Sequence, residues 1–277
     1  MKRSPLRIMS KTSLGLALAS LLVSGSAFAD EFHFLSPGTV IWNGVFVNTY
    51  LADNITNPAE NPLKIYCDDW NTDFSGTPTW TANVYTLTAG NLSNFKYGIA
   101  PQIYNVNLNL VTGYLSVAKD TAPAWSPFQR YLEAAWLDQE WETLARAGGV
   151  PSVLADEQRK ISAAMWTLFV NDSHVGALGD HPTDGLIGAI NNTGFAVAVD
   201  AYLGAAQHAV TPIALGGDGY TAPGWDVIVP VGRNSNSQYM QEFLVHDNTV
   251  PEPGSVILLG TVAGFLAFTK FRHKRQA

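Results

Sequence analysis

The chain has 277 residues, of which 47% are hydrophobic and 14% are charged. This balance excludes a disordered, highly charged protein, and the length allows one sizeable hydrophobic core or two small ones. The formal charge is −7, but half of the 16 lysines and arginines lie in the terminal segments, so residues 30–250 hold 8 basic and 22 acidic residues. Such an acidic body repels phosphate backbones, which argues against nucleic acid as a partner.

Residues 1–29 have the parts of a secretory signal peptide. A basic start precedes an apolar stretch over residues 14–23, which is too short to span a bilayer. Ala27 and Ala29 then match the small-x-small rule for signal peptidase, which predicts a mature chain that begins at Asp30. The alternative is an uncleaved N-terminal anchor.

The first half of the body predicts β-strands. Residues rich in β-branched and aromatic side chains indicate one or two strands over residues 39–51, and further strands over residues 63–67 and 80–87. Residues 53–62 read as a loop, and the Asn-rich residues 91–109 match no element.

The middle of the body predicts helices. Ser126 and Pro127 begin a helix, which ends at the glycine pair 148–149. Asp156 and Glu157 begin a second helix, which ends near residue 171. The second helix has an apolar stripe at i, i+3, i+4, i+7 and i+8 from Ile161. Weaker signals indicate helices over residues 184–190 and 195–206. Three tryptophans that lie at or beside apolar stripes are expected in the core: Trp136, Trp141 and Trp166.

The last part of the body returns to strands, over residues 225–231 and 238–246. The order of strands, helices and strands predicts an α+β fold. We expect a β-sandwich or barrel-like sheet from the N- and C-terminal strands, with a helical subdomain inserted at about residues 125–206. The predicted divisions are a signal peptide (1–29), an ectodomain (30–249) and a C-terminal tail (250–277).

Cys67 is the only cysteine, so no intrachain disulfide can form. A buried thiol that acts as a small apolar residue is one interpretation. Its surroundings, IYCDDW at residues 65–70, and the later ISAAMW at residues 161–166 together resemble the two signatures of the thioester domains of bacterial surface adhesins. There, a strand carries a cysteine in a Tyr-Cys-x-Asp-like motif and a helix carries a glutamine in a Gln-x-Ala-x-Trp-like motif. The resemblance implies an internal Cys-Gln thioester, formed with loss of ammonia, that acylates a nucleophile on a target surface.

The chain departs from this pattern where the family has glutamine. Alignment on Ala164 and Trp166 places Ser162 there, and a hydroxyl cannot form the thioester. Gln158 lies one helical turn earlier on the same face and is the available substitute. The sequence therefore predicts a thioester-like site at Cys67 and Ser162 in a chain that has kept the fold and lost the bond.

Two other groups of polar residues are candidate sites. Residues 171–184 contain Asp and His that could bind calcium or a transition metal. Their spacing matches no EF-hand, HExxH or zinc-finger motif, and a solvated loop is the alternative. Four acids share the first predicted helix, where a solvated face is the usual explanation and a glycosidase pair across a cleft is the other: Glu133, Asp138, Glu140 and Glu142. We expect no metal, no cofactor and no catalytic residue.

The C-terminus has three ordered parts. Pro251, Glu252 and Pro253 precede an almost wholly apolar segment over residues 256–268, and a basic cluster follows over residues 270–275. The stretch over residues 255–271 is at the lower limit for a spanning helix. This tail resembles the PEP-CTERM sorting signal of Gram-negative bacteria. The resemblance implies recognition by a membrane-embedded exosortase, cleavage near the Pro-Glu-Pro box, and release or transfer of the ectodomain to the surface. An ordinary C-terminal anchor is the alternative.

These features together predict an exported, non-enzymatic protein. It would be anchored transiently in the inner membrane and then delivered to the cell surface or released, with signal peptidase and exosortase as processing partners. Proteins with this tail are typical of bacteria that make exopolysaccharide and biofilm, so a structural or binding role in that matrix is the first hypothesis. A polysaccharide-processing enzyme and a thioester-type adhesin are the alternatives.

Overall fold

The structure is a computed structural model, and it describes residues 29–37, 40–42, 45–47, 49–60, 62–68, 76–98, 104–109, 112–119, 126–169, 183–233, 235–237 and 240–246. Several predicted features lie outside these ranges. They are the signal peptide up to residue 28, most of the 171–184 loop, and the sorting tail with its apolar segment.

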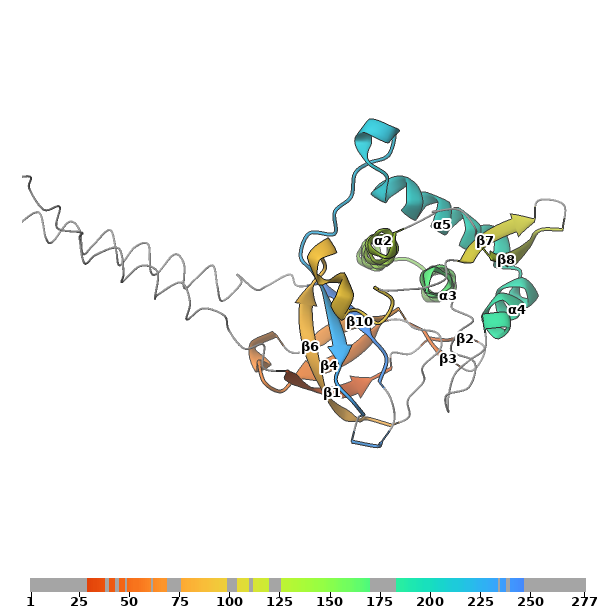
Figure 1. Cartoon of the computed structure of the whole chain (residues 1–277). Coiled ribbons are helices and arrows are strands. Elements are labelled where there is room, and N and C mark those ends of the chain that lie inside the picture. The colour runs from red at the N-terminus through yellow and green to blue at the C-terminus, as the bar shows by residue number, and fades with distance from the viewer. Residues whose placement is uncertain are drawn as a thin grey trace, which may run out of the picture.

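Six antiparallel strands close into a barrel (Figure 1). Around the barrel they run in the order β1 (Asp30–Ser36), β4 (Tyr50–Asn54), β5 (Leu63–Cys67), β10 (Phe243–His246), β9 (Trp225–Pro230) and β6 (Thr79–Thr86), which pairs back to β1. Strands from the start and the end of the body thus share one sheet, and β5 lies directly beside β10. The α+β class is confirmed, with the sheet closed as a barrel.

The described residues also include two short hairpins and three 3-10 turns. The hairpins are β2 (Ile41–Trp42) with β3 (Val45–Phe46), and β7 (Tyr104–Asn109) with β8 (Tyr114–Lys119). The 3-10 turns are η1 (Pro58–Glu60), η2 (Ala89–Asn94) and η4 (Ile213–Leu215).

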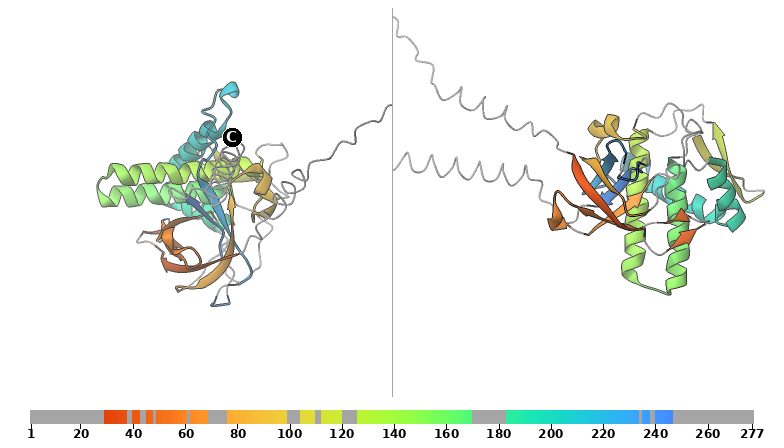
Figure 2. Two further views of the ribbon diagram at one scale, coloured as in Figure 1. Left: turned by 90° about the vertical axis from the view of Figure 1, so that its left-hand side faces the viewer. Right: turned by 90° about the horizontal axis from the view of Figure 1, so that it is seen from below.

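The helices are α2 (Pro127–Ala147), α3 (Pro151–Leu168), α4 (Thr183–Thr193) and α5 (Ala196–Val210). Helices α2 and α3 form a hairpin that lies against one side of the barrel, and α5 packs on both (Figures 1 and 2). The predicted start of α2 is confirmed: Ser126 Oγ accepts from the Gln129 amide, and the Gln129 side chain accepts from the Ser126 amide in return.

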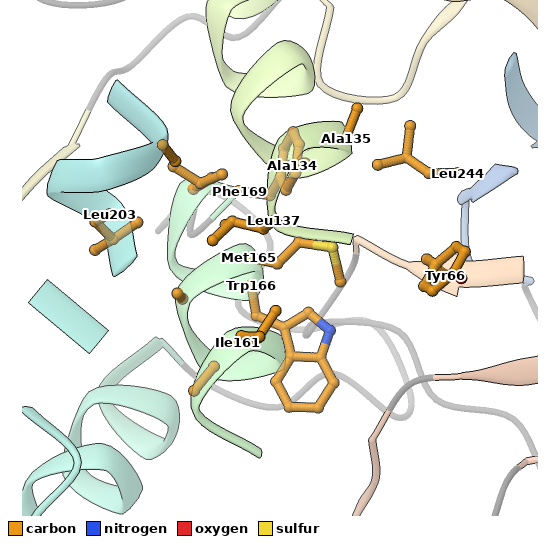
Figure 3. Packing of buried hydrophobic residues seen from close by; sticks show 14 of the residues in the cluster. Tyr66, Ala134, Ala135, Leu137, Ile161, Met165, Trp166, Phe169, Leu203 and Leu244 are labelled. Atoms are coloured by element: carbon orange, nitrogen blue, oxygen red, sulfur yellow. The ribbon is translucent and has the colours of Figure 1, made fainter. Parts of the chain in front are cut away.

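Strands β5 and β10 are buried on both faces toward one end, because the helices cover this part of the outside of the barrel. In β5 the side chains alternate: Ile65 and Cys67 belong to the barrel interior, whereas Tyr66 points to the helices. In β10, Leu244 likewise points to the helices. Figure 3 shows Tyr66 and Leu244 on the barrel side of a cluster that also holds Ala135 of α2 and Met165 of α3.

The boundaries of several elements differ from the sequence-based predictions. Helix α3 begins at Pro151 and not at Asp156, because proline is suited to the first helical position and starts the helix a full turn earlier. Strand β10 begins at Phe243 and not at 238. Strand β1 and the β7–β8 hairpin were not predicted. Strand β5 was predicted with the bounds it has.

Within the described residues, no single helix has the length and apolarity needed to cross a membrane. The segments Leu186–Thr193 and Ala196–Val210, which are bent by 115° relative to each other, meet those criteria only when taken together.

Candidate functional site

The lone cysteine lies against a buried carboxamide. Cys67 is 1% exposed and Gln241 is 6% exposed. Cys67 Sγ donates to Gln241 Oε1 across 3.0 Å. The two residues are 174 positions apart in the sequence, so the contact is made by the tertiary fold.

The register of the barrel brings these two residues near each other. Cys67 is the last residue of β5 and pairs with Phe243, the first residue of β10. Side chains two positions apart along an extended chain point to the same face. Gln241 precedes Phe243 by two positions, and its carboxamide reaches the sulfur that points into the same end of the barrel.

The two groups that form a thioester are therefore within reach of each other. The carbonyl carbon of Gln241 lies about 1.2 Å from Oε1, so it is at most about 4.2 Å from Cys67 Sγ. Reacting atoms in near-attack conformers lie about 3–3.5 Å apart. The present separation is therefore at most about 1 Å beyond this range.

The helical motif singled out in the sequence also reaches this site. Trp166 of α3 is 1% exposed, and its Nε1 donates to the backbone oxygen of Cys67 at 2.9 Å. Ser162 lies one turn earlier and is 1% exposed, but its hydroxyl has no hydrogen-bond partner among the described residues. Gln158, another turn earlier, is 6% exposed, and no contact with the thiol is observed in the described part of the chain.

The carboxamide beside Cys67 thus comes from a residue that the motif comparison did not identify. The available signal was weak. Gln241 stands in a stretch predicted to be a strand, in phase with Phe243 and Val245, whose side chains belong to the barrel interior. A polar residue in phase with core positions is unusual, but only the pairing of β5 with β10 shows what it faces.

A buried carboxylate follows each member of the pair in the sequence. Asp68 is 0% exposed and Glu242 is 1% exposed. Burial, with Glu242 and then Asp68 as added negative charges, raises the pKa of Tyr131 of α2 well above its ordinary value. The phenol therefore stays protonated, and Tyr131 Oη donates to Glu242 Oε1.

The acids of α2 do not form the solvated face that was expected. Glu133 and Asp138 are each 1% exposed and Glu142 is 6% exposed, whereas Glu140 is only partly buried. Because α2 lies between the barrel and the other helices, more than one of its faces is buried. Tyr66 of β5 donates to Glu142 Oε1 at 2.7 Å, so one of these acids joins α2 to the barrel.

Burial also sets the protonation of these acids. It raises the pKa of Glu133 to about 8, an effect that the positive charge of Arg130 opposes. It raises the pKa of Asp138 well above its ordinary value, and the nearby charge of Glu142 adds to this effect. Both groups therefore bind a proton in the folded chain at pH values where the unfolded chain has released it.

We expect the free energy of unfolding to fall as the pH rises from about 5 to 8, by on the order of 3 kcal/mol from Glu133 alone. The sign follows because the folded state binds more protons in that interval. Urea unfolding at both pH values should show a smaller fall for Glu133→Gln, with a residual slope from Asp138. Equal slopes for the wild type and Glu133→Gln would contradict the assignment.

The structure offers no support for a metal centre in the part of the chain that it describes. No group of three or more His, Cys, Asp or Glu side chains that could hold an ion occurs among those residues. The residues considered for metal binding in the 171–184 loop lie outside the described ranges, apart from residues 183 and 184 in α4.

The comparisons with known proteins found no match. No protein-family model matches the chain, and no curated protein and no solved structure matches it. Only the residues of the site therefore indicate a function.

Proposed function

We propose that Cys67 and Gln241 form an internal thioester, and that the protein uses it to attach covalently to amine groups on a target surface. Cys67 Sγ attacks Cδ of Gln241, the C–N bond of the carboxamide breaks, and ammonia leaves with the thiol proton. A primary amine of the target then attacks the same carbon. The C–S bond breaks, an amide links Gln241 to the target, and the thiol of Cys67 is restored.

The observation that carries this proposal is the buried 3.0 Å contact between the thiol and the carboxamide. Two features support it. The absence of a second cysteine leaves no intrachain disulfide to compete for the sulfur. The exposures of 1% and 6% keep bulk water from the bond, which favours the survival of a hydrolysable acyl group.

Labelling with methylamine tests the proposal. The folded protein should gain one methylamine, and peptide mapping should locate it on Gln241 as N-methylglutamine. Cys67 should become reactive toward a thiol reagent only after this step. A protein that takes up no amine while Cys67 titrates freely from the start would refute the thioester.

The two terminal segments indicate that the protein is delivered outside the cell, where such a bond could reach a target surface. We infer that the chain is exported through its signal peptide, held in the inner membrane by residues 255–271 and cut by an exosortase near Pro251, Glu252 and Pro253. The body, with its helical subdomain inserted between barrel strands, then reaches the cell surface or the exopolysaccharide matrix. Covalent capture is the chemical basis of the proposed matrix role, because matrix components that bear amines become covalently linked to the protein.

The processing route makes its own prediction. Protein recovered from its native host should begin at Asp30 and end near residues 251–253, because the predicted cleavage sites lie there. Intact mass measurement with mapping of the terminal peptides reports both ends. A chain that keeps its tail to Ala277 would instead indicate an ordinary membrane anchor, and the sorting part of the proposal would fall.

A further inference from the structure

The strand pairing that brings Cys67 near Gln241 stops at the reacting residues. The β5–β10 pairing runs over Val245, Leu244 and Phe243, and it ends where Phe243 faces Cys67. Gln241 lies beyond this ladder, in a segment without regular structure. Sheet hydrogen bonds therefore do not by themselves hold the carboxamide in place against the sulfur.

On the side of Gln241, the next residue is anchored by two hydrogen bonds. Glu242 Oε2 accepts from the Lys96 amide at 2.8 Å, and Oε1 accepts from the hydroxyl of Tyr131 in α2. The Tyr131 hydroxyl itself accepts from the Tyr97 amide at 3.0 Å. A carboxylate that is 1% exposed and held at both oxygens restricts the backbone that carries Gln241.

On the side of Cys67, the anchor comes from α3. The indole of Trp166 donates to the backbone oxygen of Cys67 at 2.9 Å. Stacking on Trp42, with ring centroids 6.2 Å apart, and burial to 1% exposure restrict the orientation of this indole. Figure 3 shows Trp166 among the packed side chains between α3 and the barrel. Helix α2 thus restrains the segment that carries Gln241, and helix α3 restrains Cys67.

We propose that the α2–α3 hairpin is a clamp that sets the distance between Cys67 and Gln241, with Tyr131 and Trp166 as positioning residues. This inference rests on the proposed thioester and adds to it the source of its geometry. Closing the bond needs the sulfur and the carbonyl carbon in one narrow arrangement, and a misplacement of about 1 Å can cost about 100-fold in rate. The clamp holds the ends of β5 and β10 so that the two atoms keep this arrangement beyond the last paired residues, Cys67 and Phe243.

Reclosure of the bond measures this role directly in the folded protein. Ammonium at high concentration reverses the first step, because ammonia attacks the thioester and restores the thiol and the carboxamide. After removal of the ammonium, the bond closes again and the intact mass falls by one ammonia, which gives a rate. We expect Tyr131→Phe and Trp166→Phe to slow this reclosure by about 10- to 100-fold.

Two substitutions serve as matched controls, because each removes a similar hydrogen bond away from the pair. Tyr202→Phe removes a phenol that donates to Glu157 at 2.6 Å, and Trp141→Phe removes an indole that donates to Thr49 at 3.0 Å. Both should reclose at the wild-type rate. Glu242→Gln is a second probe of the α2 anchor if Tyr131→Phe does not fold. An amide in place of the carboxylate cannot accept from both Lys96 and Tyr131, so it should also slow reclosure.

The outcomes separate the clamp from the bond. Slow reclosure in the folded clamp variants with normal reclosure in the controls supports the clamp. Wild-type reclosure in folded Trp166→Phe and in a folded variant of the α2 anchor overturns the clamp and leaves the thioester standing. Equal slowing in the controls also overturns it, because the effect then reflects general loosening. A wild-type protein that never loses ammonia refutes the thioester and the clamp with it.

Discussion

Replacing Cys67 by serine or Gln241 by alanine is expected to reduce the uptake of methylamine to background, a loss of at least about 100-fold. Each substitution removes one of the two atoms that the thioester joins, Sγ of Cys67 or Cδ of Gln241. Because both atoms are needed for one bond, either change alone should abolish the uptake. Intact mass after incubation with methylamine measures the loss, and thermal melting confirms that each variant is folded.

Two other variants sharpen this test. Gln158→Ala and Ser162→Ala change the positions that the helical motif indicated, and neither position is observed in contact with the thiol. Both should take up methylamine as the wild type does. Uptake that persists in Gln241→Ala, or that disappears in Gln158→Ala, would show that the carboxamide partner of Cys67 is not Gln241.

Replacing Trp166 by alanine is expected to lower the free energy of unfolding by about 4 kcal/mol, because large-to-small changes at buried aromatics cost about 3–5 kcal/mol. The side chain is 1% exposed, stacks on Trp42 and satisfies the backbone oxygen of Cys67. The loss therefore combines a cavity with a buried polar atom left without this donor. Urea unfolding at a fixed pH measures the change.

Trp141→Ala is the comparison for this experiment. Trp141 is only partly buried at the edge of the same cluster, so its removal leaves a smaller cavity and should cost clearly less. A cost below about 1 kcal/mol for Trp166→Ala would contradict the packing described for α3.

The sequence was sufficient for the elements whose signals are local. The bounds of β5 and the start of α2 were predicted from the short apolar run that contains Ile65 and Tyr66 and from a serine–proline helix start, and both are confirmed. The burial of Cys67 and Trp166 was likewise predicted and is confirmed. Each of these depends on residue type and on near neighbours in the chain.

The features that were missed depend on tertiary contacts. Glu133 and Asp138 were expected in solvent, since acids within one helix usually lie on a solvated face, but α2 is covered on more than one side. Gln241 was not identified because it lies 174 positions after Cys67. One sequence does not reveal that β5 and β10 pair. The most informative residue of the site is therefore the one with the weakest local signal.

The proposed site draws on both the barrel and the helical hairpin. The barrel brings two distant strands side by side, and the hairpin supplies side chains that bind the ends of those strands. A buried acyl bond needs both, because it must be assembled from distant residues and kept from water until a target amine arrives.

The intact mass of the folded wild-type protein, taken before any treatment, tests the central claim most directly. We predict a mass one ammonia below that calculated from the sequence, with Cys67 unreactive toward a thiol reagent until methylamine is added. A full calculated mass together with immediate labelling of Cys67 would show a free thiol beside an intact carboxamide, and the thioester proposal would be wrong.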